Sequence, residues 1–127
     1  MANAMNLTTK VLIYPEDIST TKTGSAVDLS ALNNPGGRNI KAVMSIGSQD
    51  GTTPSNTVTI EHSDTTTAAD FAAITGAAFT AVTTTGTATE EIHFKTSKRY
   101  VRAVATVTSD TTSSVVGVWL IGEERIY

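Results

Sequence analysis

The sequence predicts an all-β protein, an antiparallel β-sandwich or jelly-roll-like barrel of seven or eight short strands with a flexible N-terminal arm. The main observation is that apolar and polar residues alternate with a period of two between Thr57 and Val107. Threonine and glycine clusters interrupt this alternation about every ten residues, as turns do. The 127 residues are enough for one domain that folds without a metal or a disulfide. We therefore expect an arm of residues 1–9 and one sandwich domain of residues 10–127.

The first half of the chain is expected to contain four strands. Pro15 ends the first of them, because proline has no amide hydrogen to donate to a sheet ladder. Residues 33–37 predict a turn, since asparagine and glycine accept positive φ and proline presets the entry. The residues expected on one face of the third strand are Ile40, Ala42, Met44 and Ile46. The expected strands cover residues 10–14, 24–29, 38–48 and 57–63.

The second half is expected to contain four more strands. The alanine-rich window of residues 67–74 is compatible with a helix, but Gly76 stops it after about two turns, so an irregular connection is an equal alternative. In the strand that begins near Lys98, alternate residues share a face. One face has Val101, Ala103, Ala105 and Val107, and the other has Tyr100, Arg102, Val104 and Thr106. The expected strands cover residues 79–83, 90–96, 98–108 and 114–121.

Composition excludes several classes of partner. The formal charge of −3 and the pI near 5.2 provide no clustered positive field, so neither nucleic acid nor a membrane surface is an expected partner. The chain start lacks the pattern of a secretory signal, and no apolar run is long enough to cross a bilayer, so we expect a protein made in a cytoplasm. Charged residues make up only 17% of the chain, and threonine fills much of the difference. Such a surface is expected where a protein packs against copies of itself or a scaffold.

No catalytic, cofactor or metal site is predicted. The chain has no cysteine, and its two histidines, His62 and His93, lack the spacing of a metal site. Both histidines are expected on polar strand faces. The side chains of Glu90 and Glu91 diverge on a strand, so this pair is expected to supply edge charges that discourage wrong pairing.

Trp119 is the only tryptophan, and aliphatic residues flank it on both sides. A tryptophan in this setting is more often part of a core or a subunit interface than a platform for a sugar ring. The sugar alternative, a carbohydrate-binding module with Trp119 or Tyr100 as the stacking platform, stays open.

Three segments together resemble small β-sandwich proteins of tailed bacteriophages. They are Glu61-His62-Ser63-Asp64 at the end of a strand, the phenylalanine-containing residues 71–82, and Lys98-Arg99-Tyr100-Val101-Arg102-Ala103. The resemblance covers roughly residues 40–122, and this chain has a longer front section, residues 15–35, than the simplest members. It implies a virion head protein of the decoration or cement type, with no catalytic residues.

The resemblance implies a non-enzymatic structural protein, made in the host cytoplasm, that binds the outside of a phage capsid and bridges major capsid subunits. We expect the chain also to bind itself, as a homotrimer or alternatively a dimer. A tail-tube, neck or head-fibre subunit is the first alternative, and the carbohydrate-binding module is the second. The expected partner contacts are Asn6, Leu7, Thr8, Thr9, Asp50, Thr53, Asp64 and Asp70.

Overall fold

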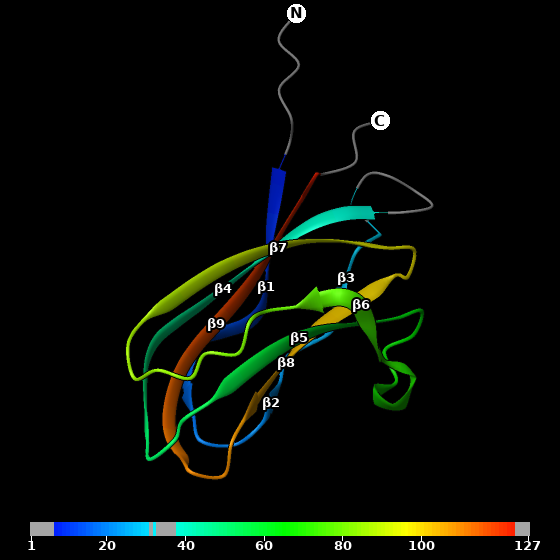
Figure 1. Cartoon of the computed structure of the whole chain (residues 1–127). Helices are drawn as coiled ribbons and strands as arrows, with labels where there is room; N and C mark the ends of the chain where they lie inside the picture. The colour runs from blue at the N-terminus through cyan, green and yellow to red at the C-terminus, as the bar shows by residue number, and fades with distance from the viewer. Residues whose placement is uncertain (1–6, 31, 33–37, 124–127) are drawn as a thin grey trace, which may run out of the picture.

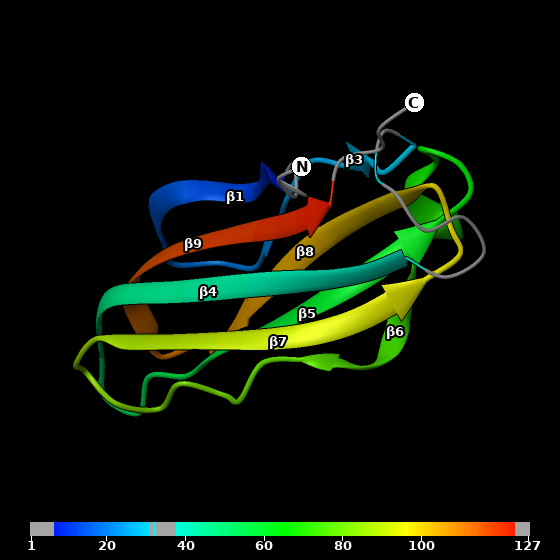
Figure 2. The same cartoon turned by 90° about the horizontal axis from the view of Figure 1, so that it is seen from above.

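Two antiparallel sheets pack face to face in the computed structural model, which describes residues 7–30, 32 and 38–123 (Figures 1 and 2). One sheet has the strand order β1-β9-β4-β7, and the other has the order β2-β8-β5-β6, with β3 also paired to β8. The predicted all-β sandwich is confirmed, with nine strands in the described residues. The elements are β1 (Leu7–Ile18), β2 (Lys22–Thr23), β3 (Val27–Asp28), β4 (Arg38–Gly51), β5 (Asn56–Ser63), the 3₁₀ turn η1 (Ala68–Asp70), β6 (Ala72–Ala78), β7 (Ala88–Thr96), β8 (Tyr100–Val107) and β9 (Thr111–Glu123).

The period of two places the core as predicted. Alternate residues of each central strand point between the sheets, where they are removed from water. On the four-stranded sheet the buried hydrophobic residues of the two central strands are Ile40, Ala42, Met44, Ile46, Val116, Val118 and Leu120. On the other sheet they are Val58, Ile60, Val101, Ala103 and Ala105.

The prediction of a strand at residues 79–83 is wrong, because β6 ends at Ala78. Phe79 and Val82 are both buried, but they are three residues apart, a spacing that a strand of period two cannot bury on one face. They belong to the connection between the two sheets, where the Phe79 amide donates to the Val58 carbonyl at 2.9 Å. The helix-compatible window contains only η1 before β6 begins.

The first strand is longer than predicted. It begins at Leu7, which pairs with Glu123, so Leu7, Thr8 and Thr9 lie in a sheet. It continues past Pro15 because register shifts between Val11 and Glu16 leave the proline outside the pairing, on an edge strand where proline is tolerated. Of the strand expected at residues 24–29, the structure contains only β3, and β2 lies before this range. The turn expected at residues 33–37 lies outside the described residues.

The core is polar at the end of the sandwich where the chain passes from β4 to β5. The Gln49 side chain donates to the Val82 carbonyl at 2.8 Å and accepts from the Ser114 hydroxyl at 3.0 Å. The Asn56 amide donates to the same Ser114 hydroxyl at 2.9 Å. Gln49, Asn56 and Ser114 are fully buried, so these bonds join both sheets to the connection that leads to β7.

Candidate assembly surfaces

Trp119 lies on the outward face of the four-stranded sheet and not in the core. Its neighbours in register are Val11 on β1 and Val43 on β4, and all three side chains are half-buried. The indole lies over Gly117: a Cβ at that position would come within 2.7 Å of the ring carbon Cη2 and 3.2 Å of the Pro15 ring. The absence of a side chain at Gly117 therefore gives the indole its place.

This face has an apolar part and a charged part. Val115 and Ile121 continue the apolar surface along β9, and they are also half-buried. We call Val11, Val43, Val115, Trp119 and Ile121 together the Trp119 face. The charged part lies on the neighbouring strands, where the Lys41 ammonium contacts the Glu91 carboxylate at 2.7 Å. Two further apolar side chains of β1 are exposed, Leu7 at 59% and Tyr14 at 74%.

Sequence reasoning did not distinguish this face from the core. Residues 115–121 contain no polar residue, so the alternation that separates inner from outer faces is missing there. The strand pairing in the structure separates the two faces. Trp119 alternates with the buried Val118 and Leu120, and it pairs with residues on the outward sides of β1 and β4.

The expected contact residues lie at two ends of the sandwich. Asp50 and Thr53 are at the end where β4 leads to β5, and both are exposed. The Thr53 amide donates to the Asp110 carboxylate at 3.2 Å, and the Thr53 hydroxyl also contacts that carboxylate. Hydrogen bonds from Thr53 and then Thr108 lower the pKa of Asp110.

The remaining expected contacts lie toward the other end. Leu7, Thr8 and Thr9 pair with the last residues of β9, and Asp64 and Asp70 flank the loop that follows β5. Asn6 lies outside the described residues. The described contact residues therefore do not form one continuous patch.

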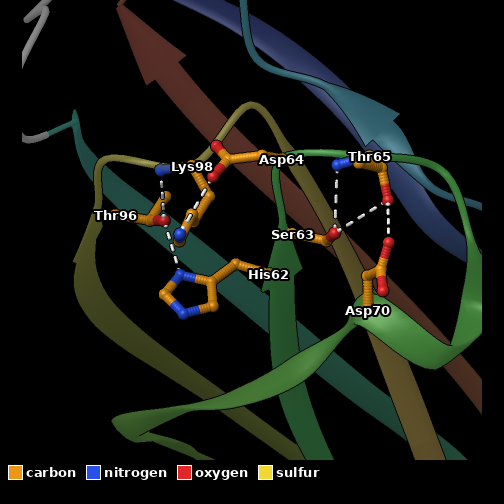
Figure 3. A network of polar contacts seen from close by, with 7 residues as sticks. All are labelled: His62, Ser63, Asp64, Thr65, Asp70, Thr96 and Lys98. Atoms are coloured by element: carbon orange, nitrogen blue, oxygen red, sulfur yellow. Dashed lines mark hydrogen bonds and ion pairs between the residues drawn. The ribbon is translucent and has the colours of Figure 1, made fainter.

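The prediction that His62 lies on a polar strand face is wrong. It shares the inner face of β5 with the buried Val58 and Ile60, and its Nδ1 lies 2.7 Å from the Thr96 hydroxyl of the opposite sheet (Figure 3). The same hydroxyl accepts from the Lys98 amide at 3.0 Å, so we assign its hydrogen to His62 and the imidazole hydrogen to Nε2. Burial, and then the positive charge of Lys98, lower the pKa of His62.

A hollow of about 330 Å³ opens beside His62. Lys98 forms an ion pair with Asp64 at 2.9 Å on one side, and the Thr65 hydroxyl donates to Asp70 at 2.6 Å on the other (Figure 3). The part of the chain that the structure describes contains no cluster of three His, Cys, Asp or Glu residues that would hold a metal ion. These contacts order the loop between β5 and β6.

The basic residues of the 98–102 segment are paired within the chain. Arg99 contacts Asp28 through two nitrogens, at 3.1 and 2.9 Å. Arg102 donates to Glu61 at 2.7 Å, and its guanidinium lies 4.2 Å from the Phe71 ring centre. Arg99, just before β8, and Arg102, on β8, are therefore each paired with a carboxylate of the same chain.

Comparison with known proteins provides a fold and no family. No family model matches the chain, and no curated protein matches its sequence. Among solved structures, it is similar to a chain in the structure of infectious bursal disease virus Gx strain, with a TM-score of 0.57 and 11% identity. That match covers 91% of this chain and 31% of the viral chain, so this chain spans less than a third of it. The similarity supports the sandwich fold.

Two other solved structures match with lower scores. The SPBc2 prophage-derived protein YomS has a TM-score of 0.47 and 12% identity, with 96% of this chain and 98% of that chain covered. The coat protein of tobacco streak virus has a TM-score of 0.43 and 10% identity, with 100% of this chain and 92% of that chain covered. Within the described residues, no helix is long and apolar enough to cross a membrane.

Proposed function

We propose that this chain is a non-enzymatic virion protein that binds the outside of a phage capsid and bridges neighbouring major capsid subunits. The observation that carries the proposal is the Trp119 face, an apolar surface on a weakly charged sandwich. Its five members are half-buried in the free chain, and the nearest charges lie at its border. An aromatic centre with a polar border is the arrangement of a protein interface. The similar sandwich of the bursal disease virus chain and the phage resemblance support a virion role.

The proposed mechanism is mass action. A protein that binds only the expanded capsid lattice stabilises that lattice by its binding free energy. Each individual contact can be weak when one molecule touches two capsid subunits, because the second contact forms at high effective concentration. Contacts from both ends of the sandwich, at Thr53 and Asp64 for example, suit a bridge between two subunits.

Co-sedimentation with expanded heads and unexpanded proheads tests the proposal directly. We expect saturable binding to expanded heads at a fixed ratio to capsid subunits. Trp119→Ala should lower occupancy of the heads about tenfold or more, because an aromatic anchor of an interface commonly contributes about 2 kcal/mol. Tyr100→Ala is the matched control, since it removes an aromatic ring from the other sheet. Wild-type protein that binds neither particle would overturn the proposal.

The contribution of the N-terminal arm needs a deletion that spares the sheet. Removing residues 1–9 would also remove three paired residues of β1, so the suitable variant lacks residues 2–6 and keeps Leu7. We expect this variant to keep the urea midpoint of the full chain and to bind heads more weakly. Unchanged head occupancy would exclude a role for the arm in attachment.

The alternatives give different results in the same experiments. A tail-tube, neck or head-fibre subunit would form rings or tubes alone and would not bind heads. The half-exposed indole of Trp119 keeps the carbohydrate-binding module as a second candidate. A carbohydrate-binding module would show a shift in tryptophan emission with soluble glycans, and the shift would disappear in Trp119→Ala.

A further inference from the structure

The four sheet edges of this sandwich differ in how well they are protected. β1 carries Pro15 and two register shifts, and β2 and β3 have two residues each. β6 has a register shift against β5 and contains Gly76 at a φ of 82°. These are the features that keep edge strands from pairing with other chains. β7 has none of them.

β7 is a regular edge, and only charged side chains, among them Glu90 and Glu91, protect it. Its nine residues, Ala88–Thr96, contain no proline and pair with β4 without a register shift. Among the described strands, β4 is its only sheet partner, so no strand pairs with the opposite side of β7. The connection from β6 runs past the start of β7 on that side (Figure 2), where the Thr80 amide donates to the Glu90 carboxylate at 2.9 Å. A long, regular edge of this kind presents backbone hydrogen-bonding groups to another strand.

We propose that a second copy of this chain pairs with this edge, β7 against β7, antiparallel about a two-fold axis at His93. The two four-stranded sheets then form one continuous eight-stranded sheet. This inference goes beyond capsid binding and does not depend on it.

The side chains of β7 favour this register. Pairing about His93 places Glu91 opposite Lys95 of the second copy, and Lys95 opposite its Glu91. On the other face, Ile92 meets Phe94 of the second copy, and this contact covers the exposed part of the half-buried Ile92. The two-fold symmetry makes each of these contacts twice.

Neighbouring registers lose the charge match. A centre at Ile92 places Glu91 opposite His93, and a centre at Phe94 places Lys95 opposite His93. A centre at Glu91 places the two carboxylates opposite each other, which is unfavourable. A slip by a single position in the pairing would bring inner residues opposite outer ones. The glutamate therefore selects one partner register while it opposes others.

The surroundings of β7 leave space for this contact from Glu91 onward, beyond the Thr80 contact with Glu90. Glu91, His93 and Lys95 are all exposed. β6 lies below β7 on the same side of the sandwich (Figure 1). The exposed residues of β6 are small: Ala72, Ala73, Thr75, Gly76 and Ala78.

Charge reversal tests the pairing through the mass in solution. We expect the wild-type chain to sediment as a dimer that dissociates on dilution. Lys95→Glu places two pairs of carboxylates in apposition and should raise the dimer dissociation constant about tenfold or more, and Glu91→Lys should act likewise. The double variant E91K/K95E recreates opposite pairs across the axis but loses the pair of Glu91 with Lys41, so it should recover part of the wild-type affinity. Lys22→Glu, which breaks the surface pair of Lys22 with Glu16, is the control and should not change the mass.

A single cysteine tests the register. Because the chain has no cysteine, His93→Cys introduces one thiol that faces its own copy across the axis, within reach of a disulfide. We expect rapid cross-linking of the two chains on mild oxidation. The control is Thr89→Cys, whose thiol would lie opposite Ser97 and far from its own copy, and it should remain uncross-linked.

The results that would overturn the β7 pairing differ from those that would overturn the capsid proposal. A monomer at all concentrations, a trimer, or a dimer in which Thr89→Cys cross-links faster than His93→Cys would overturn the β7 pairing. These measurements need no capsid, so failure of the pairing leaves the capsid proposal intact. Conversely, a β7 dimer that binds no heads would overturn only the capsid proposal.

Discussion

At the scale of single residues, His62 shows how one side chain joins the two sheets. Its ring bonds to Thr96 across the sandwich, and the bond as assigned uses the neutral imidazole as an acceptor. Protonation would give Nδ1 a hydrogen and remove this acceptor, next to the positive charge of Lys98. Burial and Lys98 therefore favour the neutral form in the folded state.

This environment predicts a loss of stability at mildly acidic pH. The pKa of His62 in the folded chain lies below its ordinary value of 6.5, so below that pH the unfolded chain binds more protons. The contribution of His62 is complete above pH 6.5 and declines as the pH falls toward the folded-state pKa. We expect the urea midpoint to decrease between pH 7 and pH 5, and His62→Gln to flatten this decrease.

His93→Gln is the control at protein concentrations where the chain is monomeric, because His93 is exposed on β7 in the single chain. A decrease that persists fully in His62→Gln would contradict the assignment. Three carboxylates with shifted pKa values do not affect this range: the pKa values of Asp28, Glu91 and Asp110 are lowered by their hydrogen-bond partners, so their contributions are lost only below about pH 5.

At the scale of elements, the end of β4 depends on a glycine. Gly51 has a φ of 146°, and a Cβ there would lie 2.3 Å from the backbone oxygen of Asp110. That oxygen belongs to the connection between β8 and β9, so β4 and this connection approach each other more closely than a side chain allows.

We expect Gly51→Ala to lower the free energy of unfolding by about 1–3 kcal/mol from backbone strain, with a further loss from the clash. Urea unfolding measures the change. Gly86→Ala is the matched control, because no atom lies within 4 Å of its added Cβ. Equal midpoints for the two variants would show that the close approach at Gly51 is unimportant for stability.

At the scale of the whole molecule, the position of Trp119 reports on assembly. The indole is half-buried in the free chain, so we expect acrylamide to quench its fluorescence. If the Trp119 face meets the capsid, quenching should fall when the protein is bound to expanded heads and remain unchanged with proheads. A blue-shifted, quencher-resistant signal in the free monomer would contradict the surface position of the ring.

The local pattern accounts for much of the fold. Each inner residue predicted on β4, from Ile40 to Ile46, is buried, because alternation along one strand is a property of that strand alone. The same reasoning failed at residues 79–83, where buried side chains serve a connection. It also ended β1 too early at Pro15, because the register shifts that accommodate a proline involve the partner strand.

The sequence by itself determined the all-β class, the inner faces of β4 and β8 and the absence of cysteine chemistry. The tertiary structure alone decided that Trp119 faces outward, that His62 faces inward toward Thr96, and that β7 is an edge of its sheet. The physical reason is the range of the interactions. Alternation arises from neighbouring residues, whereas strand order and register arise from pairing between distant segments, such as β1 with β9.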